Sequence, residues 1–401
     1  MPRHPSWTQL FRIALLMLIF SVVDRSVHAA RYYVGPDGSD SISKNQATNR
    51  STPYRTIQHA VNQADPGDFI SVFDGTYNEN VYIGRSGTPG NYIRLVAANR
   101  EGAKVRGWIS SNDQSYLLVD GFDVTNTSSI PPTKGVSFNR CHHIKVRDCR
   151  IHDCYGGGLA FDRSDSIVAE WNIVHNNAYF NVDQHSGISA YQPQKIGSDN
   201  RAWGIIFRNN TSFGNYNFVD NPNFGRPTDG NGIVIDDTRN LQAGGAGDYN
   251  RRILVENNWC FDNGGQGIHC FSSRLVYIRN NTCVNNVDSF DFGGEITLSE
   301  SSQCVVMNNI LDAKEGKFSG FQYDSSDVRW QANIFDGPTR EITPGVLNIY
   351  ADPGFIPGTI IPDVGSPAIN TATNVKSVFP LDVFGQLRYV GRLDRGAIEA
   401  Q

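Results

Sequence analysis

The sequence predicts an all-β fold in which short strands wind into a parallel solenoid, and three observations lead to this prediction. First, apolar runs of a few residues alternate with turns rich in glycine and asparagine, which is typical of proteins with many short strands. Second, a strand-like segment that ends in asparagine recurs along the chain. Third, each repeat holds three apolar runs separated by turns, so that stacked coils would share one continuous core.

The repeat is visible when its asparagines are aligned, at Asn172, Asn210, Asn258, Asn281, Asn309 and Asn333. Their spacings of 38, 48, 23, 28 and 24 residues define a basic period in the twenties with two long insertions. The third apolar run of a repeat begins with a glycine, as in Gly158-Leu159, Gly187-Ile188, Gly232-Ile233 and Gly267-Ile268. We expect the aligned asparagines to stack as a ladder in the turns between strands.

Composition excludes several classes of protein. The chain has 401 residues, a net charge of −5 and 39% hydrophobic residues, which is enough to bury a core without disulfides and argues against disorder or a coiled coil. The acidic balance argues against a nucleic-acid partner held by a basic face. The seven cysteines are an odd number at irregular spacings, so we expect buried thiols, with one bridge possible among Cys141, Cys149 and Cys154.

Residues 1–30 have the features of a secretory signal peptide. Arg3 and Arg12 precede or open an apolar run from Ile13 to Val23, which is too short to span a bilayer, and Val27-His28-Ala29 offers small residues for cleavage. The alternative is an uncleaved membrane anchor. With cleavage, the sequence predicts a periplasmic or secreted protein without a membrane partner.

The remaining chain divides into three parts. Residues 31–110 are expected to form an N-terminal cap and the first coils, where Thr52-Pro53 would begin a short helix with Ile57, Ala60, Val61 and Ala64 on its apolar face. Strands are expected at Phe69–Phe73 and Tyr92–Ala97. Residues 111–340 are expected to form β-helix coils with the active-site groove, and residues 341–401 an irregular closing segment.

The N-terminal part carries a resemblance to a known group of proteins. Thr52-Pro53-Tyr54-Arg55-Thr56-Ile57, Pro66-Gly67-Asp68 and Gly75-Thr76-Tyr77, followed by asparagine-rich coils, resemble the right-handed β-helix proteins of the pectate-lyase superfamily. The resemblance covers nearly all of the mature chain and implies a right-handed parallel β-helix. Because that superfamily holds lyases, epimerases, hydrolases and non-catalytic binders, the resemblance is more specific for fold than for activity.

Two long loops predict the position of a site. Asn215–Thr228 and Thr238–Asn250 flank the strand-like segment Asn231–Asp237, and loops of this length in a compact domain are usually functional. If Ile188, Ile233 and Ile268 point inward, alternation places their neighbours on one outer wall. The residues expected to gather on that wall and in the turns beside it are Asp183, His185, Tyr191, Asp229, Asn231, Asp236, Gln266, His269 and, after a one-residue slip, Glu295.

These residue types and the resemblance imply a lyase that cleaves a uronic-acid polysaccharide by β-elimination. Such an enzyme must neutralise the uronate carboxylate and supply a base for the C5 proton. The resemblance to calcium-dependent β-helix lyases implies Ca²⁺ held by Asp183, Asp229, Asp236 and Asp237. The family commonly uses Lys or Arg as the base, but no lysine lies on the expected outer columns, although Lys195 is near in sequence.

The sequence therefore suggests other residues for the chemistry. His269 or His185 is the candidate base, Tyr191 the candidate proton donor, and Arg239 a partner for the substrate carboxylate. The residues expected to contact the substrate are Asn231, Gln266, Glu295 and Arg274.

Other functions stay open at this point. In a polygalacturonase-like hydrolase, Asp229 and either Asp236 or Asp237 would act as acid and base. A C5-epimerase begins with the same proton abstraction as a lyase. A non-catalytic glycan-binding solenoid, such as an adhesin, would use aromatic columns that include Phe213 and Phe261. In each case the expected partner is a polysaccharide, and the default oligomeric state of a capped solenoid is a monomer.

Overall fold

The computed structural model describes residues 29–197, 201–242, 247–289, 292–343, 345–375, 378–388 and 391–400. The predicted signal peptide therefore falls outside the described residues, apart from positions 29 and 30. The described part of the chain contains no helix that is long and apolar enough to cross a membrane.

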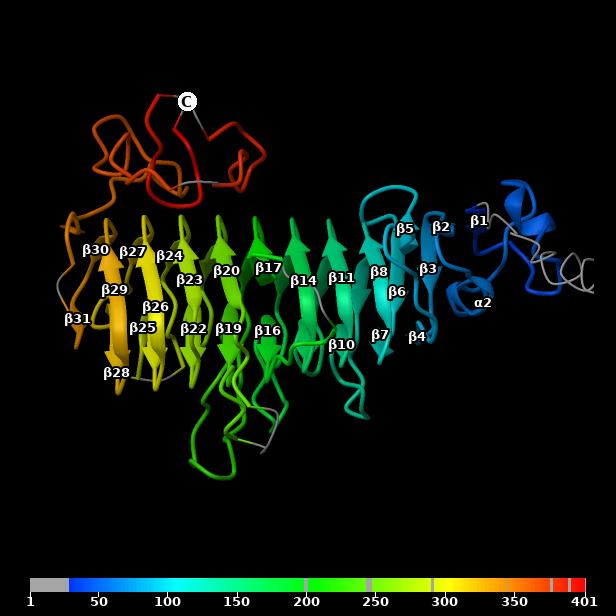
Figure 1. Cartoon of the computed structure of the whole chain (residues 1–401), viewed down its shortest axis with the longest axis horizontal. Coiled ribbons are helices and arrows are strands. Elements are labelled where there is room, and N and C mark those ends of the chain that lie inside the picture. Colours follow the sequence, from blue (N-terminus) through cyan, green and yellow to red (C-terminus); the bar gives the residue numbers. More distant parts are fainter. Residues whose placement is uncertain are drawn as a thin grey trace, which may run out of the picture.

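Successive short strands wind into a parallel β-helix with three sheets (Figure 1). Each sheet takes one strand from each coil, and the strands pair in parallel with the same element of the next coil. The expected solenoid of three strands per coil is confirmed. We name the sheets A, B and C in the order in which a coil passes through them.

Sheet A has eleven strands in the order β1 (Arg31–Val34), β2 (Phe69–Val72), β5 (Ile93–Ala97), β8 (Ser115–Asp120), β11 (His142–Arg147), β14 (Asp165–Glu170), β17 (Trp203–Arg208), β20 (Arg252–Glu256), β23 (Val276–Arg279), β26 (Ser302–Met307) and β29 (Ser326–Gln331). Sheet B has eleven strands in the order β3 (Gly75–Tyr77), β6 (Ala103–Arg106), β9 (Asp123–Thr125), β12 (Arg150–His152), β15 (Ile173–His175), β18 (Thr211–Phe213), β21 (Trp259–Phe261), β24 (Thr282–Val284), β27 (Ile310–Asp312), β30 (Ile334–Asp336) and β32 (Ile349–Tyr350).

Sheet C, which carries the candidate site, has ten strands in the order β4 (Val81–Tyr82), β7 (Ile109–Asn112), β10 (Val136–Asn139), β13 (Leu159–Asp162), β16 (Ile188–Tyr191), β19 (Ile233–Asp236), β22 (Ile268–Phe271), β25 (Gly294–Ser299), β28 (Phe318–Tyr323) and β31 (Thr339–Arg340). Ile188, Ile233 and Ile268 pair with one another across β16, β19 and β22 and are fully buried. The expected inward stack of isoleucines is therefore confirmed.

The N-terminal end of the core is covered by the 3₁₀ helix η1 (Gln46–Thr48) and the helix α2 (Ile57–Gln63). Ile57, Ala60 and Val61 form the buried face of α2, as predicted. The predicted start at Thr52-Pro53 is wrong, because Thr56 is the N-cap and its side chain accepts a hydrogen bond from His59 N. Glu79 fixes this start, since its carboxylate accepts hydrogen bonds from the amides of Ile57 and Gln58 at 2.9 Å each.

Two asparagine ladders line the turns on either side of sheet B. In the predicted ladder, each Nδ2 donates to the next Oδ1, as from Asn210 to Asn258 and from Asn258 to Asn281. A second ladder, which the sequence alignment missed, runs from Asn177 through Asn215 and Asn263 to Asn286. These buried amides satisfy the turn backbone, so each ladder holds neighbouring coils in register.

The C-terminal segment, residues 351–400, lies along one side of the coils, away from the protruding loops that follow β15 and β18 (Figure 1). Four asparagines with left-handed backbone conformations bind it. The Nδ2 groups of Asn209, Asn257, Asn280 and Asn308 donate to the carbonyl oxygens of Asp382, Leu381, Asp394 and Thr373. All seven cysteines are buried and free, so the possible bridge near Cys149 is absent.

Candidate active site

A cavity of about 820 Å³ opens on the outer face of sheet C, over β13, β16, β19 and β22. The loop after β15 and the loop after β18 form its walls; the latter protrudes below the coils in Figure 1. The sequence-predicted residues that line it are Asp183, His185, Tyr191, Asp229, Asp236, Gln266 and His269. The structure thus brings together most of the predicted wall.

Strand register explains why these side chains converge. One column of paired positions holds Asp162, Tyr191, Asp236 and Phe271. A second column, two residues earlier in each strand, holds Ser189, Val234 and His269. Coils are about 4.8 Å apart, so side chains of one column lie within reach of the same ligand. The alternation that buries the isoleucines places both columns on the outer face.

Hydrogen bonds between the two loops hold the walls of the cavity. Gln184 accepts a hydrogen bond from Thr228 N at 2.9 Å and donates to Val219 O at 3.0 Å. Asn217 donates to the carbonyl of His185 at 3.1 Å. The loop after β15, which sequence reasoning did not single out as a wall, is therefore fastened to the predicted loop after β18.

Two carboxyl groups in the cavity have raised pKa values. Burial raises the pKa of Asp229 to about 6, although Thr228 and Asn231 donate hydrogen bonds to it. Burial, and then the negative charge of Asp229, raise the pKa of Asp236 to about 8, and Gln242 donates to its Oδ1 at 2.7 Å. Near neutral pH, Asp229 is then mainly ionised while Asp236 keeps its proton, which divides the pair into a base and an acid.

Two histidines in the cavity are neutral. Burial lowers the pKa of His269 to about 4, and neither of its ring nitrogens has a hydrogen-bond partner among the residues that the structure describes. Burial and then the charge of Lys134 lower the pKa of His185 to about 3, and its Nδ1 is also without a partner. Gly156 and Gly157 make room for His185, because a Cβ on Gly156 would lie 3.1 Å from its Nδ1. Buried polar atoms are normally paired, so these nitrogens are available to a ligand.

Sequence reasoning missed two cations that line the cavity, Lys134 and Arg226. Lys134 Nζ lies 2.7 Å from Asp162 Oδ2. Extending the alignment of glycine-led runs one coil earlier, to Gly135-Val136, would have placed Lys134 just before the wall, since Val136 pairs with Leu159. Arg226 comes from the wall loop, whose conformation no repeat pattern specifies.

Five predicted residues do not line this cavity. Asp237 adopts a left-handed backbone conformation at φ 51°, which turns it away from the column of Asp236, and its carboxylate accepts hydrogen bonds from Gln192 Nε2, Leu241 N and Gln242 N. Asn231 is fully buried and its Nδ2 donates to Ser186 and Asp229, so it supports the wall and does not face the cavity.

The expected place of Glu295 beside His269 is wrong. Thr297 pairs with His269, and Ile296 pairs with Ile268 without a slip in register. Glu295 is fully buried, where its carboxylate accepts hydrogen bonds from the backbone and side chain of Asn286 and ends the second asparagine ladder. Burial raises its pKa to about 8.

Arg239 and Arg274 line a second, smaller cavity of about 410 Å³ instead. Glu300 lines both cavities, so the two adjoin. Arg274 is paired with Asp248, and its NH2 donates to Gln303 at 2.8 Å. Both arginines were predicted to contact the substrate, but neither lines the larger cavity that holds His269 and Asp236.

The four aspartates predicted to hold calcium do not lie together in the described part of the chain. Asp237 is outside the cavity with both oxygens engaged, while Asp183 is exposed on the loop. Among the described residues, no group of three or more His, Cys, Asp or Glu side chains is arranged to hold a metal ion. Since the donor set does not fit the ion, we derive no step through calcium.

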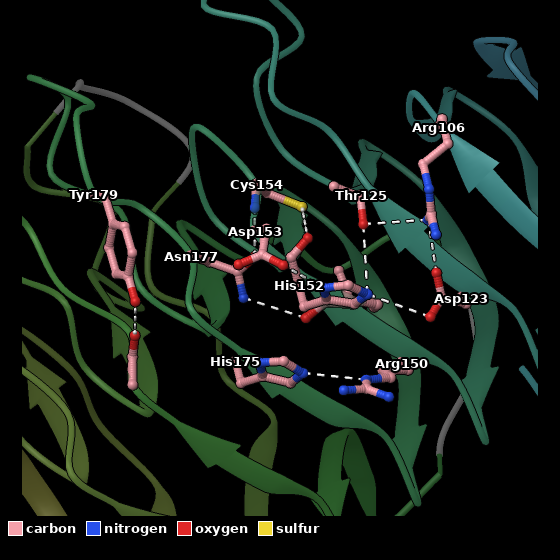
Figure 2. Close-up of polar contacts among 12 residues, drawn as sticks. Arg106, Asp123, Thr125, Arg150, His152, Asp153, Cys154, His175, Asn177 and Tyr179 are labelled. Carbon is pink, nitrogen blue, oxygen red and sulfur yellow. Dashed lines mark hydrogen bonds and ion pairs between the residues drawn. The ribbon is translucent and has the colours of Figure 1, made fainter.

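A second cluster of histidines lies on sheet B, where His152, unlike His269 in the cavity, is paired with two carboxylates (Figure 2). His152 bonds Asp153 through Nδ1 at 2.6 Å and Asp123 through Nε2 at 3.3 Å, and these interactions raise its pKa. Arg106 also pairs with Asp123 at 2.7 Å. His175 stacks on His152 with ring centroids 5.0 Å apart and accepts a hydrogen bond from Arg150.

Comparisons with known proteins agree with the fold. Residues 32–197 match the family described as Pel9A-like, right-handed beta helix region. Pectate lyase L of Dickeya chrysanthemi is 23% identical over 284 residues, which cover 66% of this chain and 55% of that protein. This chain spans 15% and 55% of the lengths of the two curated relatives that it matches.

The solved structures that resemble this chain include a lyase and a hydrolase. Pectate lyase Pel9A aligns with a TM-score of 0.58 and 16% identity over 94% of this chain and 98% of its own. A glycoside hydrolase aligns with a TM-score of 0.55 and 9% identity over 80% of this chain and 96% of its own. At such identities the likeness shows the fold, and the right-handed parallel β-helix that the sequence resemblance implied is confirmed.

Proposed function

We propose that the protein is a polysaccharide lyase that cleaves a uronic-acid-containing chain by β-elimination in the cavity on sheet C. One observation carries the proposal: a neutral histidine with unpartnered ring nitrogens, His269, shares a cavity with two carboxyl groups of different pKa and two cations. The fold shared with pectate lyase Pel9A supports it.

The proposed step abstracts a proton from C5 of the uronate. Neutral His269 takes this proton, the C4–O4 bond breaks, a double bond forms between C4 and C5, and the departing O4 takes a proton from the enzyme. Protonated Asp236 is the proposed donor of that proton, with Tyr191 as a neighbouring hydrogen-bond donor in the same column. His185, on the facing loop, is a second candidate base.

Charge in the C5 carboxylate must be stabilised as the proton leaves. Lys134 and Arg226 are the cations that line the cavity, and we assign this role to them in place of Arg239. Asp162 pairs with Lys134 and fixes its position. The predicted contact residue Gln266 lines the cavity and can hydrogen-bond sugar hydroxyls.

A glycoside hydrolase is the second candidate, and the carboxyl pair favours it. Asp229 and Asp236 lie in one cavity with pKa values of about 6 and about 8, which is the division of roles that acid–base hydrolysis requires. In this candidate Asp236 protonates the leaving oxygen and Asp229 acts on water or on the anomeric carbon.

The products separate the two candidates. We would incubate the mature protein with polygalacturonate, alginate and glucuronan, and follow the ultraviolet absorbance of the unsaturated sugar together with reducing ends. A lyase raises both signals in step, whereas a hydrolase raises only reducing ends. Reducing ends without absorbance on every substrate would contradict the lyase proposal.

Calcium and cellular location are tested alongside. Parallel reactions with a chelator, and with calcium restored, measure whether the ion contributes. Asp229→Asn would remove that response if this carboxylate binds the ion. We also propose that the protein acts outside the cytoplasm, since residues 1–30 have the features of a signal peptide, and fractionation of cells tests this point. We propose that it is a monomer, which size-exclusion chromatography tests.

A further inference from the structure

Two phenylalanines on the wall loops are exposed side by side. Phe180 is 56% exposed and Phe218 is 58% exposed, and their ring centroids are 6.4 Å apart. Tyr179 lies 5.0 Å from Phe218, and Tyr216 stacks on Phe218 at 5.3 Å with an interplanar angle of 14°. We call these four residues the aromatic patch.

Both tyrosines are fixed from behind. The Tyr179 hydroxyl, seen in Figure 2, donates to Gly214 O at 3.2 Å, and the Tyr216 hydroxyl donates to Asp288 at 3.2 Å. Backbone bonding from Phe218 N to Tyr179 O at 2.9 Å ties the two loops together at the same point. The patch is therefore a preorganised surface that keeps two rings in water, although burying such rings would stabilise the fold.

The patch is continuous with the cavity. Val219, next to Phe218, accepts a hydrogen bond from Gln184, and Asn217 donates to the carbonyl of His185; both Gln184 and His185 line the cavity. Phe224, on the same loop, is 65% exposed and lines the cavity itself. The aromatic patch is therefore joined by hydrogen bonds to the residues that line the cavity.

We propose that the aromatic patch is a remote subsite that stacks on an uncharged sugar ring of the same polysaccharide chain that enters the cavity. This inference rests on the proposed function. A pyranose ring presents an apolar C–H face of the size of one aromatic ring, and contact between the two is favourable in the same way as other aromatic packing. The charged residues next to the patch in sequence, Asp183 and Asp220, are exposed carboxylates, so an uncharged sugar fits better than a second uronate.

The substrate class follows from this arrangement. Cations in the cavity select a uronate at the point of cleavage, while the patch selects a neutral sugar some residues away. The preferred polymer would then contain both kinds of sugar, either alternating in the backbone or with neutral branches.

Affinity electrophoresis tests the patch without requiring turnover. Native gels would contain either polygalacturonate or a polymer in which galacturonate alternates with rhamnose, and the retardation of wild type, Phe180→Ala and Phe218→Ala would give dissociation constants. We expect each substitution to weaken binding of the alternating polymer about tenfold and of polygalacturonate much less. The matched control is Leu387→Ala, since Leu387 is 63% exposed on the C-terminal segment.

The variant Phe218→Tyr separates the loss of ring stacking from a general disturbance of the loop. It keeps the aromatic ring and should bind the alternating polymer as wild type does. Equal retardation of wild type and the alanine variants, or no retardation of the wild type by the alternating polymer, would overturn the patch. Turnover of short uronate oligomers, which reach the cavity alone, is measured separately. If short oligomers are cleaved but the alanine variants bind the polymer as wild type does, the aromatic patch is contradicted and the lyase proposal is not. If the alanine variants bind more weakly but no oligomer is cleaved, the lyase proposal is contradicted and the binding role of the patch is not.

Discussion

The cavity on sheet C and the group formed by His152, Asp123 and Asp153 on sheet B use the same residue types with opposite results. On sheet B, His152 lies between two carboxylates and its pKa is raised, while Asp123, although burial works against it, has its pKa lowered to about 2 by His152 and Arg106. In the cavity, burial lowers the pKa of His269, which has no partner among the described residues, and burial and then the charge of Asp229 raise that of Asp236. Paired charges stabilise the coil stack, whereas unpaired polar groups are held ready for a ligand.

The largest expected effect comes from the two histidines of this comparison. His269→Gln should lower turnover about 10²–10⁴-fold, the range for loss of a general base, because the amide cannot take the C5 proton. The matched control His152→Gln should leave turnover unchanged. Both are measured as kcat on the substrate identified above, with circular dichroism to check folding; a catalytic loss in His152→Gln alone would reverse the roles of the two clusters.

The second prediction concerns Asp236 and pH. Turnover should rise as pH increases through about 4, where His269 loses its proton, and fall as pH increases through about 8, where Asp236 loses its proton. Asp236→Asn should lower kcat by about 10²-fold and remove the alkaline limb from the residual profile. A wild-type profile that stays flat between pH 7 and pH 10, in the same assay, would contradict a role for protonated Asp236.

Asp236 also affects stability, with a sign that follows from its raised pKa. Its contribution is fully present below the unfolded pKa of about 3.9 and is lost as pH rises through about 8, because the folded protein resists ionising it. Asp236→Asn should therefore melt at a higher temperature than wild type at pH 9, and the two should converge near pH 4. Thermal unfolding by calorimetry at both pH values measures this.

The third prediction concerns the paired side of the comparison. Asp123→Asn should lower the free energy of unfolding by about 1–3 kcal/mol at pH 7, because it leaves His152 and Arg106 short of an acceptor. The contribution of Asp123 is present above its unfolded pKa and is lost as pH falls through about 2. Urea unfolding should show the loss while kcat stays at the wild-type value; a drop in kcat with unchanged stability would mean that sheet B takes part in catalysis.

The smallest effect is expected at Arg226. Arg226→Gln should raise KM for a uronate substrate about tenfold and lower kcat less than Asp236→Asn does, because the arginine binds the carboxylate before reaction and shares the stabilisation of its charge with Lys134. Arg252→Gln is the control, since Arg252 is an exposed cation on β20. Equal KM values for the two variants would remove Arg226 from the substrate contacts.

The sequence predicted those parts of the molecule that repeat. Ile188, Ile233 and Ile268 follow a period of two within a period in the twenties, so their inward stack and the outer columns of Tyr191 and His269 could be read from spacing. Departures from the repeat could not be read in this way. Asp237 follows Asp236 directly, and only its left-handed backbone conformation separates them.

Glu295 shows a different limit. Glu295 comes directly before the buried Ile296, whereas His269 comes directly after the buried Ile268. The local sequence pattern does not indicate that the Glu295 carboxylate takes the place of an asparagine at the end of a ladder. Lys134 directly precedes Gly135-Val136, the glycine-led run one coil before Gly158-Leu159, so the repeat pattern does indicate its position. Arg226 and the aromatic patch belong to loops held by contacts between residues far apart in sequence, such as Gln184 with Val219, which no periodicity encodes.

The amides that bind the C-terminal segment have a consequence for the order of assembly. Four asparagines of successive coils donate hydrogen bonds to the C-terminal segment. They are Asn209, Asn257, Asn280 and Asn308, and all of their acceptors lie between Thr373 and Asp394. If the solenoid folds from its capped N-terminal end, its coils would form before the C-terminal segment binds to them. The last hydrogen bonds of the fold would then be those made by about the final thirty residues.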